Sequence, residues 1–178
     1  VSRMRQWTAD VETAPSLLLV GRPGVGKTSM MHVVRSILFS HLSPGEESRS
    51  VMSLNASDKR GPAFVSHTLD AFVRTSKVEK ARVKLVILDE LDRMDAKGQE
   101  RLASLIDAST ATWFCGMCNH LELVAASLQS RLRAEMFSAV GTACMVARMS
   151  HIATSVGSIS CSKVKLPLLK YIASVSRG

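Results

Sequence analysis

Residues 17–30 read Leu-Leu-Leu-Val-Gly-Arg-Pro-Gly-Val-Gly-Lys-Thr-Ser-Met, and this stretch decides the fold. Four consecutive apolar residues at 17–20 predict a short buried strand. Apolar residues from Met30 onward recur at helical spacing, so a helix follows. Residues 21–28 between them match G-x-x-x-x-G-K-[ST], which places a phosphate-binding loop between a strand and a helix start. A chance glycine turn before a helix is the weaker alternative in this context.

The loop predicts a nucleotide site with magnesium. Its glycines let backbone N–H groups converge on an anion, and the helix N-terminus adds partial positive charge. Lys27 can reach the β- and γ-phosphates, and the hydroxyl of Thr28 can ligate Mg²⁺. The residues that we expect at the nucleotide are Gly21, Arg22, Pro23, Gly24, Val25, Gly26, Lys27, Thr28, Ser29 and, from a later strand, Asn119.

A second apolar run, residues 85–88, follows Lys84 and is followed by two adjacent acids, Asp89 and Glu90. Its composition fits a strand buried on both faces of a parallel sheet, and such strands present ligand-binding residues at their carboxyl ends. We expect Asp89 to hold Mg²⁺ and Glu90 to orient and activate the attacking water. The alternative is an acidic strand-to-helix loop in which Asp92 or Asp95 is only a helix cap.

Asn119 follows a third apolar run, residues 113–118. We expect its side chain to lie between the γ-phosphate and the attacking water, although turns and caps are the commonest use of asparagine. Further expected elements are a strand at 51–54, a helix after Pro62, a helix at 96–107 and a short helix at 121–128. Residues 43–50 are expected to form a loop. Residues 1–16 are polar and irregular, with a helix over part of them left open, and the pattern is helical from Gly141 onward.

Composition restricts the class of protein. A chain of 178 residues can hold one α/β domain with a small appendage, and its net charge of +8 suits an anionic partner such as nucleic acid. A basic protein without such a partner remains the alternative. No apolar run approaches membrane-spanning length and no signal peptide is visible, so no membrane partner is expected. The chain begins with Val1, so it is treated as a possible fragment.

The four cysteines predict no metal site and no disulfide. Cys115 and Cys118 have C-x-x-C spacing but no second pair, and in a strand residues three apart point to opposite faces. Together with Cys144 and Cys161 they are expected to be reduced thiols of an intracellular protein.

The motifs occur in an order that resembles replication factor C subunits, the AAA+ clamp loaders of eukaryotes and archaea. They are residues 21–28, the stretch Leu54-Asn-Ala-Ser-Asp-Lys-Arg-Gly61, Leu88-Asp-Glu90, Cys118-Asn119 and Leu128-Gln-Ser-Arg131. The N-A-S-D-x-R-G stretch is the most discriminating, because many ATPases share the phosphate loop. The resemblance covers residues 15–131 well and the remainder more weakly.

The resemblance implies an α/β fold: a nucleotide-binding base domain at 1–140, with a five-stranded parallel sheet in the order 5-1-4-3-2, then a partial helical lid at 141–178. It implies that Glu90 and Asn119 are catalytic and that Arg131 reaches the nucleotide of a neighbouring subunit. It also implies ATP and Mg²⁺ as cofactors, four other loader subunits, a sliding clamp and primer–template DNA as partners, and a nuclear location. Lys59 and Arg60 are the candidate DNA contacts.

The chain departs from the family pattern at several positions. Arg22 replaces a proline of the phosphate loop, Leu91 replaces the alanine of D-E-A-D, and Lys59 replaces a glutamate. The second-sensor arginine, the collar and the segment that packs on adenine are expected to lie outside this chain. Two alternatives to a clamp-loading ATPase therefore remain: a nucleotide-binding assembly module with little hydrolysis, and an origin-recognition or initiator ATPase. A GTPase is not expected, because no N-K-x-D motif occurs.

Overall fold

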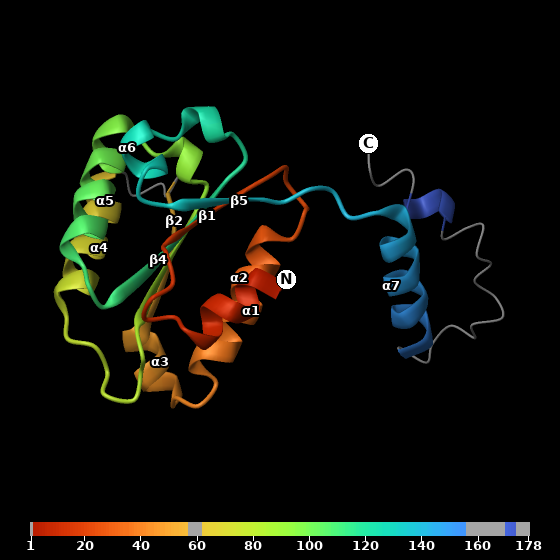
Figure 1. Ribbon diagram of the computed structural model, residues 1–178, viewed down its shortest axis with the longest axis horizontal. Coiled ribbons are helices and arrows are strands. Elements are labelled where there is room, and N and C mark those ends of the chain that lie inside the picture. The colour runs from red at the N-terminus through yellow and green to blue at the C-terminus, as the bar shows by residue number, and fades with distance from the viewer. Residues whose placement is uncertain (1, 57–61, 156–169, 174–178) are drawn as a thin grey trace. The chain divides into compact units, whose positions relative to one another are not determined.

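The computed structural model describes residues 2–56, 62–155 and 170–173, and the chain divides into two compact units, one up to Phe137 and one from Ser138. Five parallel strands form one sheet in the first unit (Figure 1). The strands are β1 (Leu17–Val20), β2 (Val51–Asn55), β3 (Lys84–Asp89), β4 (Thr112–Cys118) and β5 (Arg133–Met136). The order β2-β3-β4-β1-β5 confirms the order 5-1-4-3-2 implied by the resemblance.

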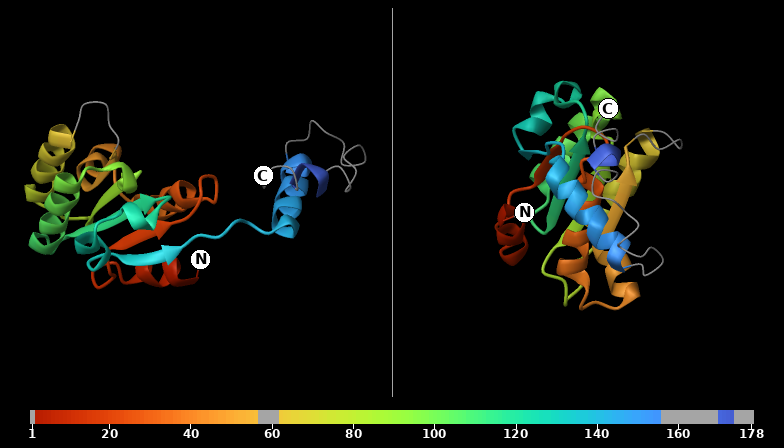
Figure 2. Two further views of the ribbon diagram at one scale, coloured as in Figure 1. Left: turned by 90° about the horizontal axis from the view of Figure 1, so that it is seen from above. Right: turned by 90° about the vertical axis from the view of Figure 1, so that its right-hand side faces the viewer.

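Helices cover both faces of this sheet (Figures 1 and 2). The elements of the first unit are α1 (Ser2–Ala9), α2 (Lys27–Phe39), α3 (Pro44–Ser50), α4 (Pro62–Arg74), α5 (Ala96–Ala108) and α6 (Ala126–Gln129), with the 3₁₀ turns η1 (Leu91–Arg93) and η2 (Leu121–Leu123). The second unit contains α7 (Thr142–Ser155). In the described residues no helix is both long enough and apolar enough to cross a membrane.

Alternate residues of each central strand enter two separate cores, because successive side chains of a strand point to opposite faces. Leu17 and Leu19 of β1 pack with α1 and α2, whereas Leu18 and Val20 pack with α4, α5 and α6. Both faces of the central strands are thus buried, as their continuous apolar runs predict. Cys115 and Cys118 lie in different cores, which confirms that they face opposite sides of the sheet.

Two local expectations were wrong, and a third that was left open is decided. Residues 43–50 contain α3, because Ser43 and Glu46 form a capping box and Pro44 occupies the first turn. Residues 2–9, where a helix was left open, form α1, whose Met4 is buried with α2. The stretch at 121–128 is not one helix: η2 and α6 are separated by Val124 and Ala125, and Val124 is extended and buried.

Gln99 of α5 explains this interruption. Its side chain is buried, donates to the carbonyls of Met94 (2.9 Å) and Leu123 (3.1 Å), and accepts from the backbone N–H of Ala125 at 2.6 Å. Those backbone groups are therefore satisfied by a side chain rather than by continued helix. Gln99 thereby fastens the segment that leads to Arg131 against α5.

The second unit has a small apolar cluster of its own. Val146 of α7 and Ala173 are buried together, with Met145 and Met149 packed beside them. Its assignment as a partial lid rests on the resemblance and stays a prediction.

Candidate nucleotide site

The loop after β1 is shaped by its three glycines, for two different reasons. Gly24 and Gly26 have φ values of +78° and +98°, a region that residues with a Cβ rarely adopt. Gly21 does not have a positive φ of this kind. A Cβ at this position would instead collide with the backbone carbonyl oxygen of Phe137. The loop thus turns at Gly24 and Gly26 and passes close to the end of β5 at Gly21.

Lys27, the first residue of α2, is buried and its ammonium lies within the loop. It donates to the carbonyls of Gly21 (2.5 Å) and Arg22 (3.1 Å) and to Oδ1 of Asn119 (2.9 Å). The register explains the last contact, since Val20 at the end of β1 is paired with Cys118 at the end of β4. The residues that follow each strand therefore meet at the carboxyl edge of the sheet.

The acids after β3 reach the same edge. The hydroxyl of Thr28 lies 3.5 Å from Oδ2 of Asp89, while Oδ1 of Asp89 accepts from the backbone N–H of Glu90 at 2.9 Å. Glu90 is the one described non-glycine residue with positive φ, at 54°, which is typical of residues held in strained conformations at functional sites. Its carboxylate lies 3.4 Å from the guanidinium of Arg93.

Asp92 connects the acidic turn to the end of β4. Its Oδ2 accepts from the backbone N–H groups of Asn119 and His120, both at 3.1 Å, and its Oδ1 is buried without a partner among the described residues. Asp95 is the N-cap of α5 and accepts from the N–H of Gly98 at 3.3 Å. The capping alternative is therefore correct for Asp95, whereas Asp92 orients the segment that carries Asn119.

Two adjoining pockets open at this edge of the sheet. A polar pocket of about 310 Å³ is lined by Pro23, Gly24, Gly26, Lys27, Thr28, Ser29, Asp89, Glu90 and Asn119. A larger, mainly apolar pocket of about 520 Å³ shares Gly26 and Ser29 with it and extends along α1 and α2. Its walls are Met4, Arg5, Thr8, Val25, Gly26, Ser29, Met30, Val33, Val34, Ile37 and Phe137. The arrangement suits a ligand with an anionic part and an apolar part.

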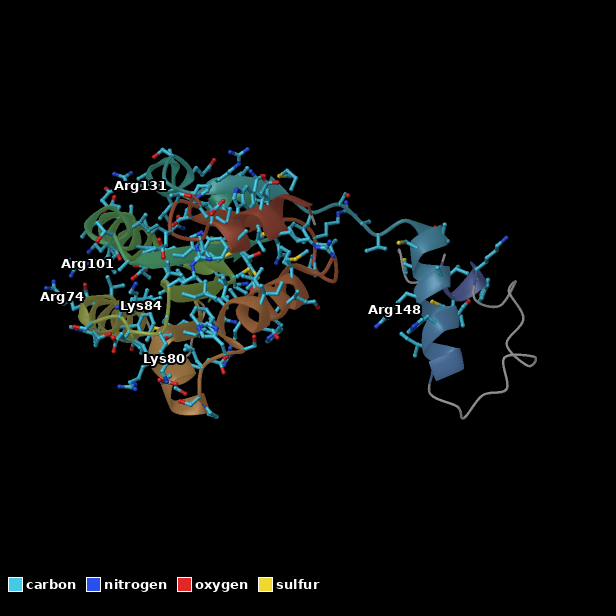
Figure 3. The ribbon with its side chains drawn as sticks, turned by 60° about the horizontal axis from the view of Figure 1, so that its bottom comes forward. Arg74, Lys80, Lys84, Arg101, Arg131 and Arg148 are labelled. Carbon is cyan, nitrogen blue, oxygen red and sulfur yellow. The ribbon has the colours of Figure 1, made fainter. Side chains whose placement is uncertain are left out.

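Arg131 belongs to a different part of the surface. Arg131, labelled in Figure 3, follows α6. It is paired with Asp107 of α5, with Nη2 2.7 Å from Oδ2. The pairing raises the pKa of Arg131 and lowers the pKa of Asp107, chiefly because the hydrogen bonds between them favour both ionised forms, and also because their charges are opposite. The candidate DNA contacts Lys59 and Arg60 lie outside the described residues.

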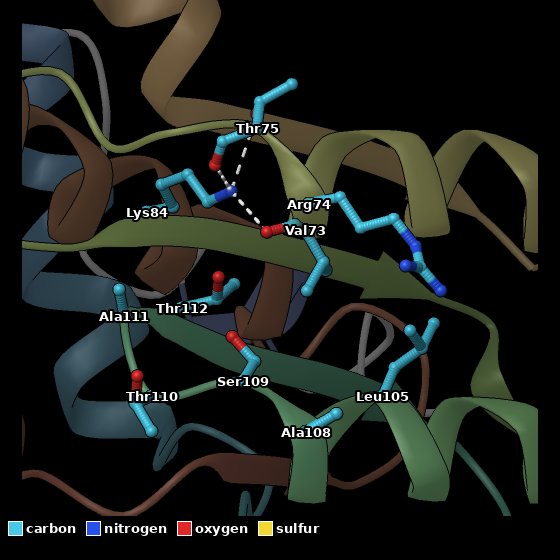
Figure 4. A pocket seen from close by; sticks show the side chains of 10 residues that line it. All are labelled: Val73, Arg74, Thr75, Lys84, Leu105, Ala108, Ser109, Thr110, Ala111 and Thr112. Carbon is cyan, nitrogen blue, oxygen red and sulfur yellow. Dashed lines mark hydrogen bonds between the residues drawn. The ribbon is translucent and has the colours of Figure 1, made fainter.

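A third pocket, of about 290 Å³, lies at the opposite ends of β3 and β4 (Figure 4). Buried Lys84 donates there to the carbonyls of Phe72 (2.5 Å), Val73 (2.8 Å) and Thr75 (2.7 Å) at the end of α4. A cation at a helix C-terminus satisfies carbonyls that have no partner within the helix. Burial lowers the pKa of Lys84, and this group stabilises α4 rather than the nucleotide site.

Sequence reasoning missed Asp107 and the roles of Asp92 and Gln99. The capping alternative treated Asp92 only as a possible helix cap. Nothing in the sequence links Asp107 to an arginine 24 residues later. A buried glutamine within an otherwise amphipathic helix likewise has no local signal. These side chains are recognisable only once the elements they join are placed in space.

Comparison with known proteins defines the family. Residues 17–140 match the model of the ATPase family associated with various cellular activities (AAA). The chain is 38% identical to mouse replication factor C subunit 5 over 78% of this chain and 40% of that protein. It is 37% identical to replication factor C small subunit 1 of Pyrobaculum arsenaticum, over 80% of this chain and 43% of that protein.

Solved structures share the fold. The Thermotoga maritima RuvB Holliday junction branch migration motor superposes with a TM-score of 0.71 and 19% identity, over 98% of this chain and 53% of that one. The fold and the family match agree: the chain belongs to the AAA ATPase family. Its relatives here are replication factor C subunits, of which it spans less than half the length.

Proposed function

We propose that this chain is the nucleotide-binding part of a sliding-clamp loader subunit of the replication factor C type, acting in DNA replication and repair. Membership of the AAA family and the similarity to replication factor C subunits from mouse and an archaeon support this function. One observation carries the proposed chemistry: a lysine, a hydroxyl, two carboxylates and an amide from three separate segments line one pocket.

ATP fits the paired pockets. The triphosphate lies in the polar pocket, where loop N–H groups, the start of α2 and Lys27 supply positive potential. The adenosine occupies the apolar pocket along α1 and α2. Met4, Arg5 and Thr8 of α1 form one wall, so part of the wall that the resemblance placed outside the chain is supplied by α1.

The side chains present also fit Mg²⁺. The Thr28 hydroxyl and the Asp89 carboxylate, 3.5 Å apart, are hard oxygen ligands, and Mg²⁺ on nucleotides takes few protein ligands beside phosphates and water. The bound ion neutralises developing phosphate charge. These two side chains would hold it, and the N–H of Glu90 fixes the Asp89 carboxylate.

The remaining site residues, Glu90, Asn119 and Arg131, would carry out the hydrolysis of ATP. A water oxygen attacks the γ-phosphorus, the bond to the β–γ bridging oxygen breaks, and ADP and inorganic phosphate leave. Glu90 orients the water and receives its proton, and Asn119 holds the water and the γ-phosphate in line. The resemblance assigns Arg131 to the nucleotide of the adjacent subunit, and Arg131 is not among the residues that line this chain's own polar pocket.

The proposed partners are the other loader subunits, a ring-shaped clamp and primer–template DNA. The net charge of +8 suits contacts with DNA phosphates, for which Lys59 and Arg60 remain the candidates. A eukaryotic subunit would act in the nucleus, as the mouse relative suggests; the archaeal relative leaves the source open.

The test is DNA-stimulated ATPase activity of this chain assembled with replication factor C partner subunits. Glu90→Gln should bind ATP and lose hydrolysis at this site; unchanged single-turnover hydrolysis there would exclude the mechanism. Arg131→Ala should leave this chain's own ATP affinity intact and impair the adjacent site. Failure of the chain to bind ATP would exclude the function altogether.

One observation favours a second candidate, an assembly module that binds ATP and barely hydrolyses it. The carboxylate of Glu90 is within 3.4 Å of Arg93, which can hold it away from a water. The variant Arg93→Ala distinguishes the hydrolysing subunit from the assembly module. Faster single-turnover hydrolysis in the variant would show that the ion pair with Arg93 restrains Glu90.

A further inference from the structure

Hydrogen bonds to Asp107 and to the carbonyl of Ser127 hold the guanidinium of Arg131 in a defined orientation. Its Nε lies 2.8 Å from both carboxylate oxygens of Asp107, and its Nη2 lies 2.7 Å from Oδ2. Its Nη1 donates to the carbonyl of Ser127 at 2.7 Å. A carboxylate on one edge and a carbonyl at a terminal nitrogen fix both the position and the rotation of the planar group.

These hydrogen bonds leave some N–H groups of the Arg131 guanidinium available for a second anion. Of the five N–H groups of a guanidinium, Asp107 and the Ser127 carbonyl take one on each nitrogen. One N–H therefore remains on each terminal nitrogen, and the only further described acceptor is Oγ of Ser130, 3.5 Å from Nη1. The Arg131 side chain keeps 34% of its surface exposed, so an incoming phosphate can reach these donors.

We propose that Asp107 is a positioning residue that holds Arg131 ready for the phosphate of a nucleotide bound to a neighbouring subunit. The inference rests on the proposed function, which places Arg131 at that phosphate. Without the carboxylate, a long arginine side chain at the surface samples many rotamers and must be ordered when subunits meet. With the Asp107 carboxylate in place, the Arg131 side chain is already ordered before the subunits assemble. Only the unused N–H donors of its guanidinium then face the neighbouring subunit.

The opposite role is a lock, in which Asp107 competes with the phosphate and must release Arg131. The geometry argues against this role, since the carboxylate engages the Nε edge and leaves an N–H on each terminal nitrogen. The two roles predict changes of opposite sign when the carboxylate is removed.

The experiment measures single-turnover ATP hydrolysis at the adjacent site, in the complex with replication factor C partner subunits. Every version of this chain carries Glu90→Gln, so that its own site is silent. Asp107→Ala should slow the adjacent site about 10- to 100-fold, as expected for a misplaced catalytic group. Asp107→Glu should restore part of the rate, and in an Arg131→Ala background Asp107→Ala should have no further effect.

Asp70→Ala is the matched control, because Asp70 is also paired with an arginine, Arg101 of α5, at 2.5 Å. It should leave the adjacent site unchanged, and complex formation is followed by size-exclusion chromatography for every variant. A faster rate in Asp107→Ala, an unchanged rate, or additive effects of the two substitutions would overturn the positioning role. If Arg131→Ala itself has no effect, the in-trans role in the proposed function fails instead.

Discussion

Lys27 and Asn119 are 92 residues apart in the chain, yet Nζ of the first lies 2.9 Å from Oδ1 of the second. The pairing of β1 with β4 creates this contact, since each residue belongs to the segment that follows a strand of the pair. The amide of Asn119 and two loop carbonyls hold the ammonium inside the loop that would surround a phosphate. The contact therefore links the two segments that we expect to bind the γ-phosphate.

Lys27→Ala should weaken ATP binding by about 10- to 100-fold, because hydrogen bonds to charged groups are worth roughly 1.5–3 kcal/mol. The measurement is titration with a fluorescent ATP analogue in the presence of Mg²⁺. Lys97→Ala, at an exposed lysine of α5, is the control and should bind normally. Equal affinities for the two variants would contradict the proposed phosphate site.

Asp92→Ala should release the segment after β4. Both backbone N–H groups that Asp92 satisfies would lose their acceptor, at a cost of about 1–3 kcal/mol each where they stay buried. Amide hydrogen exchange at Asn119 and His120 should accelerate. Asp95→Ala removes only the cap of α5 and should leave exchange at these two amides unchanged, even though it lowers stability.

The glycines predict a graded series. Gly21→Ala should destabilise the protein most, because the new Cβ meets the carbonyl of Phe137. Gly24→Ala should cost about 1–2 kcal/mol, since its φ of +78° is strained for alanine although the space is open. Gly45→Ala, in α3 with open space around it, should be neutral or stabilising by up to about 1 kcal/mol. Urea unfolding would test the order.

Lys84→Met should destabilise the protein, because three carbonyls at the end of α4 lose their donor. The pH dependence has a definite sign. Burial lowers the pKa of Lys84 below the ordinary value of 10.5, so the unfolded state binds more protons between the two values. The stability of the wild type relative to Lys84→Met should therefore rise as the pH increases toward 10.5. A parallel pH dependence of the two proteins would contradict a buried ammonium here.

Much of this fold could be predicted because its central strands are continuous apolar runs that end in chemical motifs. Residues 17–28 and 84–90 each combine a buried strand with the residues that follow its carboxyl end, so both the element and its role are local. The strand β5 carries no such signal, since Arg133 and Met136 are exposed at the sheet edge. The strand β5 forms because it pairs with β1, and no local sequence pattern indicates this pairing.

The site was predicted less completely for the same reason. Motif spacing predicts which residues would face the proposed nucleotide, because phosphate and metal chemistry restrict the residue types. It does not indicate which side chains hold those residues in place. Asp92 and Asp107 each contact a segment that is distant in the sequence and is brought close only by tertiary packing. The helix α3 is a different case, because Ser43 and Glu46 have the spacing of a capping box and the helix was still missed.

The Arg131–Asp107 pair makes a prediction that needs no partner subunit. The guanidinium holds the pKa of the Asp107 carboxyl below its usual value, so Arg131→Ala should return that pKa to the ordinary range for an exposed aspartate. NMR titration of the aspartate carboxyl carbons would measure the shift. Arg133→Ala, at another arginine close to the same segment, is the control and should leave Asp107 unchanged, because Arg133 is paired with Glu135 at 3.3 Å. An Asp107 pKa that is the same with and without Arg131 would show that the pair does not form in solution, and the orientation inferred for Arg131 would then have no support.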